Sequence, residues 1–383
     1  MSKGSEMKKC LQALFGFAVV AAAMTLAAQL VFAQPDWMLG LFKKADAANP
    51  IFKPLPESTF QCPISGKTVN WEASYVYNPA AIVKDGKVYL LYRAQGKMDG
   101  KVSLVSRVGL AESEDGIHFT RLPEPVLYPD NDFMKRYEWP GGCEDPRVVE
   151  DEEGTFYLTY TAFDGKIARL CVATSQDLVH WQKHGPVFAR AYGGRYLNIW
   201  SKSGAIVTGF KDGRQIARKI NGKYWMYWGD SDIFIATSDN LTDWTPVEME
   251  KTQRISMFKQ IGTGKLKRLI TTRSGNFDSG LVESGPAPFL TDKGMVFIYN
   301  SKNKNFPGLP KGAYAAGQIL IDAADPTRVL IRTDSYFISP DQTFEKAGQV
   351  NNVVFIEGLV RFKDRLLLYY GTADTDISVA VAP

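Results

Sequence analysis

Histidine is scarce in this chain of 383 residues, which contains only His118, His180 and His184. His118 and His180 lie at the same place in a recurring strand segment, so a histidine-based catalytic triad is not expected. A Gly-x-Ser-x-Gly segment and a phosphate-cradling glycine loop are also missing from the sequence. These absences exclude serine hydrolases with a nucleophile elbow and nucleotide-binding proteins of the P-loop type.

An excess of charge of one sign is missing as well. The chain has 45 Lys and Arg against 41 Asp and Glu, a formal net charge of +4, and 22% of its residues are charged. So small an excess, without a basic stripe, argues against a nucleic-acid partner. The composition also excludes a disordered chain and a coiled coil.

Cysteines number four, and only Cys62, Cys143 and Cys171 follow the first 33 residues. Three is an odd number and their spacing matches no metal motif, so at most one disulfide can form. We expect buried free thiols, with Cys143 as the exception because charged residues follow it. We expect neither a metal nor a cofactor.

The one long apolar run lies at the N-terminus, where Leu11–Ala33 follows Lys8 and Lys9. The basic flank, the apolar run and the small residues Val31 and Ala33 are typical of a signal peptide over residues 1–33. An uncleaved membrane anchor is the alternative, but polar residues interrupt the run and favour cleavage. We therefore expect an exported protein, periplasmic or extracellular, without stable membrane association after cleavage.

Aromatic strand segments, by contrast, are abundant, and one of them recurs five times. Its copies are Gly86–Arg93 (GKVYLLYR), Gly154–Thr161 (GTFYLTYT), Gly222–Gly229 (GKYWMYWG), Gly294–Ser301 (GMVFIYNS) and Asp364–Gly371 (DRLLLYYG). Successive copies begin 68, 68, 72 and 70 residues apart. A nearly constant period is the signature of a repeat architecture.

A second segment follows three of the copies, at 111–119, 173–181 and 236–244, and ends in an aromatic residue after an Asp or Asn turn. Period-two alternation with frequent turns marks antiparallel strands. A repeat of about 70 residues holds four strands, one propeller blade, so five copies predict an all-β fold, a five-bladed β-propeller. We predict a signal peptide at 1–33, an N-terminal extension packed on the propeller at 34–70, and the catalytic propeller domain at 71–383.

The first candidate site lies in GGCEDPR, residues 141–147. Pro146 restricts the backbone of Asp145 and is expected to push it towards an extended conformation. Arg147 offers a planar cation that can clamp a neighbouring acid or a ligand hydroxyl. A charged surface turn is the alternative, but the place at the start of a strand favours a functional role.

Other acids hold comparable places near the repeats: Glu283 before a Gly-Pro turn, Asp230 after the third copy and Asp374 after the fifth. Acids that converge from different repeats suit glycoside hydrolysis, in which one carboxyl protonates the leaving oxygen and another activates water. A calcium site is the alternative. It is disfavoured because no short loop carries three or more acids at alternating positions.

Polar and aromatic residues of the first and third repeats could bind a sugar. Asn78 and Arg93 lie at the two ends of a predicted strand pair, and their long polar groups suit recognition of hydroxyls. Tyr92 and Trp228 could stack on a sugar face, and packing between repeats is the alternative for both.

With these residues, the chain resembles glycoside hydrolase family 130, which contains mannoside phosphorylases and mannosidases. The similarity runs from about Asn78 to the C-terminus through NPAAI, LLYR, GGCEDPR, SGPAPFLTDKG and YYGTAD. The resemblance implies a five-bladed propeller that acts with inversion on an oligosaccharide, a β-mannoside. It implies that Asp145 is the general acid and that its proton passes through a hydroxyl of the sugar.

The resemblance also implies a set of substrate-binding residues. These are Asn78, Arg93, Arg107, Glu144, Arg147 and Asp374, with Lys202 matching a lysine of the family's third repeat.

Departures from the family pattern bear on the reaction. Phosphorylases of the family usually carry arginines around the third repeat and a Tyr-His-Gly after the fourth. Here these places read Trp200, Trp228-Gly229-Asp230 and Tyr299-Asn300-Ser301. A carboxylate repels a phosphate dianion, and an unpaired dianion is costly to desolvate. Water fits instead, with Glu283, Asp230 or Glu357 as the base.

The sequence therefore predicts an exported, inverting β-mannosidase that releases mannose from β-1,2-linked oligomannosides. A β-mannoside phosphorylase that makes mannose 1-phosphate is the runner-up. A non-catalytic glycan-binding propeller is the alternative from another class, and a different five-bladed glycosidase, such as an arabinofuranosidase, is a third.

Overall fold

The computed structural model describes residues 35–211, 214–249 and 265–383. The predicted signal peptide at 1–33 lies outside these residues. The chain divides into two units, Met1–Met38 and Leu39–Pro383, and the second carries the fold described below. Across the described ranges, no helix has the length and apolar character needed to cross a membrane.

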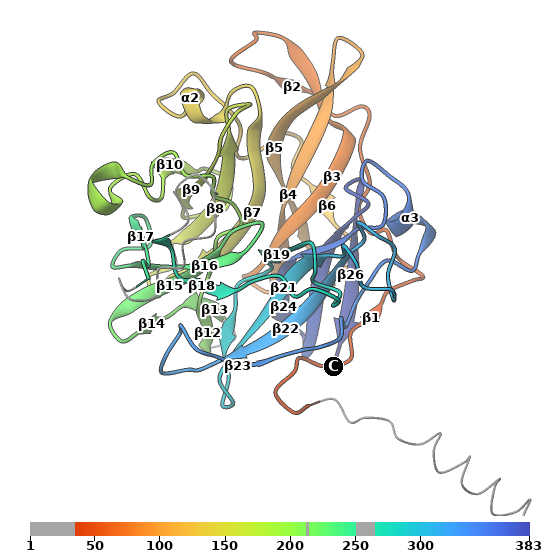
Figure 1. Ribbon diagram of the computed structural model, residues 1–383. Coiled ribbons are helices and arrows are strands. Elements are labelled where there is room, and N and C mark those ends of the chain that lie inside the picture. The colour runs from red at the N-terminus through yellow and green to blue at the C-terminus, as the bar shows by residue number, and fades with distance from the viewer. Residues whose placement is uncertain (1–34, 212–213, 250–264) are drawn as a thin grey trace, which may run out of the picture. The chain divides into compact units, whose positions relative to one another are not determined.

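The described strands of the unit Leu39–Pro383 pair mostly antiparallel and form sheets of 4, 16 and 6 strands, and their order along the chain divides them into five strand groups (Figure 1). Strand group one contains β2 (Phe60–Gln61), β3 (Thr68–Lys84), β4 (Lys87–Met98), β5 (Lys101–Ser113) and β6 (Thr120–Arg121). Strand group two contains β7 (Gly142–Glu150), β8 (Phe156–Phe163), β9 (Ala168–Ser175) and β10 (Gln182–Pro186).

The remaining strand groups follow the same order along the chain. Strand group three contains β11 (Ala205–Ile206), β14 (Lys219–Ile220), β15 (Lys223–Trp228), β16 (Ile233–Ser238), β17 (Trp244–Pro246) and β18 (Arg268–Ile270). Strand group four contains β19 (Leu281–Ser284), β20 (Phe289–Leu290), β21 (Met295–Lys302), β22 (Tyr314–Ile321) and β23 (Val329–Arg332). Strand group five contains β24 (Val354–Phe362), β25 (Arg365–Thr372), β26 (Asp376–Ala382) and β1 (Lys43–Lys44).

A few elements connect these groups. The hairpin of β12 (Thr208–Lys211) and β13 (Arg214–Ala217) bridges β20 and β7 through single parallel pairings, and β5 meets β7 where Ser106 lies opposite Gly142. Helices are short in the described residues: α2 (Lys135–Glu138), α3 (Thr343–Lys346) and the 3₁₀ turn η1 (Ala191–Gly194). The prediction of an all-β fold is therefore confirmed.

The five recurring segments form one strand in each group, namely β4, β8, β15, β21 and β25. The tyrosine near the end of each segment is fully buried in the core (Tyr92, Tyr160, Tyr227, Tyr299 and Tyr370), whereas Tyr89, Tyr157 and Tyr224 are only partly buried. Tyr92 and Trp228 are both 0% exposed, so they pack inside the protein and neither can stack on a sugar.

The buried tyrosine of the recurring segment is stabilised by a hydrogen bond of its hydroxyl as well as by apolar packing of its ring. In strand group two, Tyr160 donates a hydrogen bond of 2.8 Å to Glu138, which also pairs with Lys183 at 2.6 Å. Comparable triplets are Tyr92–Glu72–Arg121, Tyr299–Asp278–Arg332 and Tyr370–Glu345–Lys44. A buried hydroxyl needs a partner and a buried carboxylate needs a cation, so each triplet satisfies both requirements.

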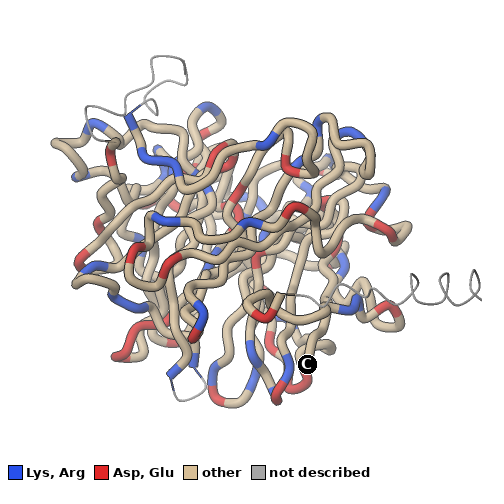
Figure 2. Tube along the Cα trace, turned by 60° about the horizontal axis from the view of Figure 1, so that its bottom comes forward, with Lys and Arg blue, Asp and Glu red and all other residues tan. Residues whose placement is uncertain are grey.

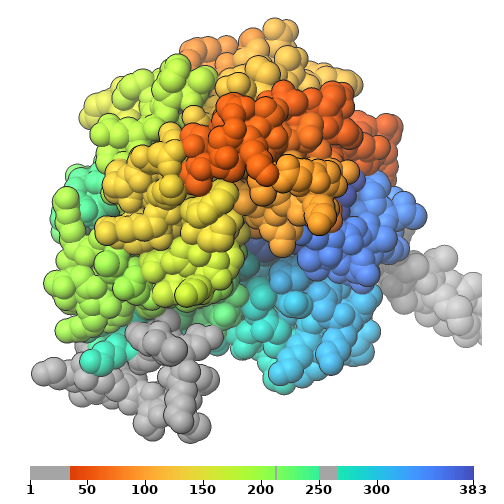
Figure 3. Space-filling view, turned by 90° about the horizontal axis from the view of Figure 1, so that it is seen from above, coloured from red at the N-terminus to blue at the C-terminus, as the bar shows by residue number. Residues whose placement is uncertain are grey.

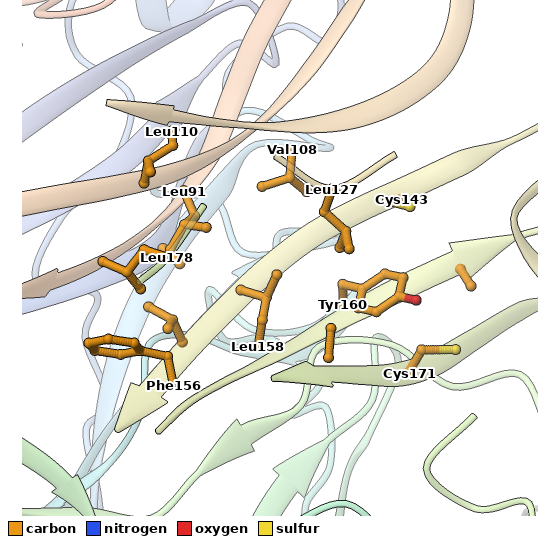
Figure 4. Close-up of a cluster of buried hydrophobic side chains, with 14 of the residues drawn as sticks. Leu91, Val108, Leu110, Leu127, Cys143, Phe156, Leu158, Tyr160, Cys171 and Leu178 are labelled. Carbon is orange, nitrogen blue, oxygen red and sulfur yellow. The ribbon is translucent and has the colours of Figure 1, made fainter. Parts of the chain in front are cut away.

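An apolar cluster between strand groups one and two shows how neighbouring groups pack (Figure 4). Leu91 and Val108 meet Leu158 and Tyr160 across the space between them. Cys143 also lies in this cluster, so burial raises the pKa of its thiol well above the usual range. Cys62, Cys143 and Cys171 are free and buried, as predicted, and Cys143 is no exception.

Charges are spread evenly over the described chain. Figure 2 shows Lys and Arg alternating with Asp and Glu along the trace. This distribution agrees with the small net charge of the sequence.

Candidate active site

The carboxyl group of Asp145, on β7, is the centre of a buried polar cluster. Asn78 Nδ2 donates to Asp145 Oδ1 at 2.9 Å, and Arg93 Nη1 donates to the same oxygen at 2.9 Å. Lys202 Nζ lies 3.1 Å from the other oxygen, Oδ2. Burial opposes ionisation of Asp145, but the charges of Arg93 and Lys202 and the Asn78 hydrogen bond lower its pKa below the usual range.

The backbone of Asp145 is not extended, contrary to the prediction from Pro146. Its φ is 49°, in the left-handed region, and the β7–β8 register shifts between Glu144 and Arg147. Asn78, which also precedes a proline, has the same φ of 49° and a register shift beside it. Bulges re-aim side chains, and Asn and Asp tolerate the left-handed region, so both side chains can point at the same place.

Arg93 holds the two acids of the EDP segment together. Its Nη2 donates to Glu144 Oε1 at 2.8 Å while Nη1 bonds Asp145. Its Nε donates to Ser106 Oγ at 2.9 Å, and its guanidinium lies 4.9 Å from the centre of the Tyr77 ring. A planar cation held on three sides is a rigid support for a carboxylate pair.

Lys202 is the second cation of the cluster and comes from the segment before β11. Its Nζ lies 3.1 Å from Asp145 and 3.5 Å from Glu144. Burial alone would lower the pKa of Lys202, but Asp145 and Glu144 raise it well above the usual value. Lys202 is therefore a fixed positive charge beside the proposed acid.

Among the carboxyl groups of the site, Glu283 on β19 has the surroundings that best suit a general base. It is 7% exposed, and Ser203 Oγ donates a short hydrogen bond to its Oε1. Burial, together with the neighbouring carboxylate Asp230 and against the charge of Lys202, raises the pKa of Glu283 to about 7. A pKa near neutral is what a general base requires.

Arg147 joins strand groups two and four at the floor of the site. Its Nε donates to Gly285 O at 2.9 Å and its Nη2 to Ser284 O at 2.6 Å. Nη2 also lies 3.0 Å from Glu357 Oε1, in an orientation that leaves both oxygens of Glu357 without a well-directed hydrogen bond from the described chain. Burial raises the pKa of Glu357 well above the usual range, against the charge of Arg147.

Asp374 and Asp230 lie on either side of the cluster. Burial raises the pKa of Asp374 to about 6, and Arg93 opposes this rise. Asp230 follows β15 and accepts a hydrogen bond of 2.9 Å from Trp200 Nε1, whose side chain is largely exposed. Asp230 thus acts electrostatically on Glu283.

Arg107 is the one predicted binding residue whose contacts lie elsewhere. Its Nη1 donates to Val105 O at 3.3 Å and its Nη2 to Cys62 Sγ at 3.7 Å, and the guanidinium lies 5.7 Å from the Phe60 ring. Arg107 is 3% exposed. Its role in substrate binding therefore stays a prediction, since it shares no hydrogen bond with Asp145 or Glu144 in the described structure.

Trp200, Gly229 and Asn300, which stand at the positions expected to carry cations in phosphorylases, make other contacts in this chain. Trp200 binds Asp230, and the backbone N of Gly229 donates to Lys202 O at 2.9 Å. Asn300 is fully buried and exchanges two hydrogen bonds of 2.8 Å with the backbone of Ile356, which ties β21 to β24. These three residues add no cation to the Glu283 side of the cluster.

A cavity of about 480 Å³ opens beside the acid. It is lined by strand groups one, two and five, including Arg93, Glu144 and Asp374, with Leu104 and Val350 as exposed apolar residues. Figure 3 shows orange, yellow and blue segments of these groups adjoining on one face. A cavity whose lining combines charged and apolar side chains suits a saccharide.

Sequence reasoning did not find Ser203 or Tyr77, which support Glu283 and Arg93. Ser203 follows Lys202 directly, but a lone serine in a loop carries no recognisable signal. Tyr77 precedes Asn78, and an aromatic residue in a strand is usually core.

Comparison with known proteins identifies the family of this chain. Residues 42–383 match the sequence model of glycoside hydrolase family 130, described as beta-1,4-mannooligosaccharide phosphorylase. A 1,2-beta-oligomannan phosphorylase from Thermoanaerobacter sp. (strain X514) is 32% identical over 81% of this chain and 90% of its own length. A beta-1,2-mannobiose phosphorylase of the same organism is 30% identical over 82% of this chain and 92% of its own.

Two solved structures are more similar still. A glycosyl hydrolase from Bacteroides ovatus has a TM-score of 0.84 and 44% identity, covering 91% of this chain and 95% of that one. The second is the structure of a family member, described with glycoside hydrolases that target beta-1,2 mannosidic linkages in Candida mannan. It has a TM-score of 0.85 and 45% identity, covering 91% of this chain and 95% of that one.

Proposed function

The chain belongs to glycoside hydrolase family 130, whose members act on β-mannosides, and we propose that it hydrolyses β-1,2-linked oligomannosides with inversion. The observation that carries the proposal is the environment of Glu283. It is a buried carboxyl group with a pKa of about 7 that faces another carboxylate, Asp230. Membership in this family replaces the alternative of an arabinofuranosidase.

In the proposed reaction, a water oxygen attacks the anomeric carbon and the bond to the leaving oxygen breaks. Glu283 accepts the proton of the water, and the leaving oxygen receives a proton that originates from Asp145. Asp145 is ionised in the free protein because of Arg93 and Lys202. A sugar that excludes water from Asp145 would raise its pKa, which lets it carry the proton.

Glu283 is the preferred base among three carboxyl groups. Glu357 lies 3.0 Å from Arg147, its side chain has no exposed surface, and burial raises its pKa well above the usual range, so it is the less suitable base. Asp230 is bonded to Trp200 and sits further towards solvent. Glu283 alone combines burial, a hydrogen bond that fixes its direction and a pKa near neutral.

Hydrolysis is favoured over phosphorolysis by charge. A phosphate dianion beside Glu283 would meet Asp230 and Glu283 itself, with Trp200 and Asn300 where phosphorylases carry cations. Two negative groups close to an incoming dianion disfavour its binding by several kcal/mol. The higher identity to solved structures described as hydrolases, 44% and 45%, supports the same choice.

We place the oligomannoside chain in the cavity of about 480 Å³ beside Arg93, Glu144 and Asp374. We also propose that the five strand groups are the blades of a five-bladed propeller, because each contains one copy of the recurring segment. Export of the protein, with residues 1–33 as a cleaved signal peptide, remains part of the proposal and rests on the sequence alone.

The test is incubation of the purified protein with β-1,2-mannobiose, with and without inorganic phosphate. We expect mannose as the product under both conditions, with no increase in turnover on adding phosphate. Asp145→Asn should lower kcat by roughly 10²–10⁴-fold, the usual contribution of a general acid. Release of mannose 1-phosphate would favour the phosphorylase, and unchanged substrate with the wild-type protein would favour the glycan-binding propeller.

A further inference from the structure

The segment Ser201–Gly204, just before β11, touches both halves of the proposed catalytic machinery. Lys202 reaches Asp145 at 3.1 Å, and the next residue, Ser203, donates its hydroxyl to Glu283 Oε1. Ser203 and Glu283 are 80 residues apart in sequence, so this contact exists only in the folded protein. Two adjacent residues thus hold the acid and the base.

This segment is firmly anchored. Its backbone and Ser201 hydroxyl make hydrogen bonds with strand groups two and three, namely Ser201 N to Ala168 O at 3.0 Å, Leu170 N to Ser201 Oγ at 2.9 Å, Gly229 N to Lys202 O at 2.9 Å and Thr159 Oγ1 to Gly204 O at 2.6 Å. A Cβ on Gly204 would lie 2.8 Å from side-chain atoms of Leu170 and Met226. The segment therefore has little room to move. It can hold Lys202 and Ser203 in fixed positions beside Asp145 and Glu283.

Ser203 itself has an unfavourable backbone. Its φ is 56°, in the left-handed region where residues other than glycine, asparagine and aspartate are uncommon, and its side chain is fully buried. Such a conformation persists only where the surroundings impose it, and it is often found at functional sites. A glycine would adopt this φ without strain, so a serine at this position indicates a use for the hydroxyl.

We propose that Ser203 is a positioning residue for the base: its hydroxyl orients Glu283 and favours the ionised carboxylate that accepts the proton of water. This inference rests on the proposed function, because it takes Glu283 as the base. Through Lys202, the same segment fixes Asp145, so the spacing of acid and base is set by two neighbouring residues.

Several charged or titratable groups face Glu283 from the elements around it: Lys202, Asp230, Arg147, Glu357 and Tyr314. Burial raises the pKa of Glu283, and the Ser203 hydrogen bond is one of the effects that oppose the rise. Loss of the hydroxyl therefore moves the pKa of Glu283 upward from about 7. Because the base works only when ionised, the acidic limb of the pH profile must move to higher pH.

The test uses Ser203→Gly, which removes the hydroxyl and also relieves the positive φ. We expect a loss of kcat of roughly ten- to a hundredfold on β-1,2-mannobiose at pH 7, with a KM within about threefold of wild type. We expect the acidic limb of the kcat profile to move up by about one pH unit. Thermal stability should be equal to or higher than that of the wild type.

Ser203→Ala should show the same pH shift with lower stability, since alanine keeps the strained φ. Asp85→Gly is the matched control: Asp85 has a φ of 49° in the exposed turn between β3 and β4 and lies outside the site. It should leave the pH profile unchanged.

The outcomes separate the inference from the proposed function. An unshifted acidic limb in Ser203→Gly, together with an inactive Glu283→Gln, would overturn the role of Ser203 and leave the base in place. Wild-type turnover by Glu283→Gln would overturn the base and the role of Ser203 with it. A loss of activity in Ser203→Gly without a pH shift would mean that the serine acts only on structure, which also overturns the inference.

Discussion

Glu283→Gln should make this protein inactive and, at neutral pH, more stable. The variant keeps the size of the side chain and an oxygen that can accept the Ser203 hydrogen bond, but it removes the ionisation. Burial raises the pKa of Glu283 from 4.5 to about 7. A folded state that resists ionisation loses stability once the unfolded state can ionise freely.

The sign and size of the effect follow from these two values. Below pH 4.5, Glu283 is protonated in both states, and its ionisation costs the fold nothing. Between pH 4.5 and 7 the unfolded chain ionises while the folded one does not, so the wild type loses stability as the pH rises. A pKa difference of this size corresponds to about 3 kcal/mol, reached near pH 7 and constant above it.

Urea unfolding of wild type and Glu283→Gln between pH 4.5 and 8 measures this difference. We expect near-equal stability at pH 4.5 and a variant that is more stable by about 2–3 kcal/mol at pH 8. Glu124→Gln, at an exposed surface position, is the control and should show no such pH dependence. A constant difference at all pH values, or a variant less stable at pH 8, would refute the assignment of a raised pKa to Glu283.

Two further predictions address residues away from the base. Arg107→Met should keep KM for β-1,2-mannobiose within about threefold of wild type, because its guanidinium contacts Val105 and Cys62 rather than the acid cluster; a KM raised more than about tenfold would show that Arg107 binds the sugar. Glu138→Ala should lower the free energy of unfolding by about 3 kcal/mol, since Lys183, with 9% of its side chain exposed, loses its nearer carboxylate at 2.6 Å and keeps only Asp132 at 3.4 Å. Tyr160→Phe, which keeps the ion pair and loses one hydrogen bond, should cost about 1 kcal/mol in the same urea assay, and equal costs would contradict the ion-pair argument.

The repeat was readable from the sequence because its cause is local. Each copy of the recurring segment alternates in the way a strand does. Its tyrosine recurs because each strand group buries one hydroxyl with a partner, an acid in four groups and the carbonyl of Pro326 for Tyr227 in strand group three. The partners of these tyrosines, such as Glu138 and Asp278, were not predicted. They lie in different kinds of element, Glu138 in the short helix α2 and Asp278 in a turn, so no shared sequence pattern distinguishes them from solvated charges.

Asp145 was also found from its neighbours, but its conformation was not. The rule that proline favours an extended preceding residue describes a free chain. Here a bulge between Glu144 and Arg147 imposes a φ of 49°, and hydrogen bonds from Asn78 and Arg93 stabilise the result. Tertiary contacts outweighed a local preference of small energy.

Sequence alone determined the all-β class, the candidate acid Asp145 and the missing cations at Trp200 and Asn300, because residue type and spacing are properties of the chain. It named Glu283 or Asp230 as the base, with Glu357 as a further candidate and a substrate-binding residue. Only the tertiary structure ranked them, and it alone brought Ser203 to Glu283. The reason is physical: a pKa depends on burial and on charges that arrive from distant segments, and neither quantity exists before the chain folds.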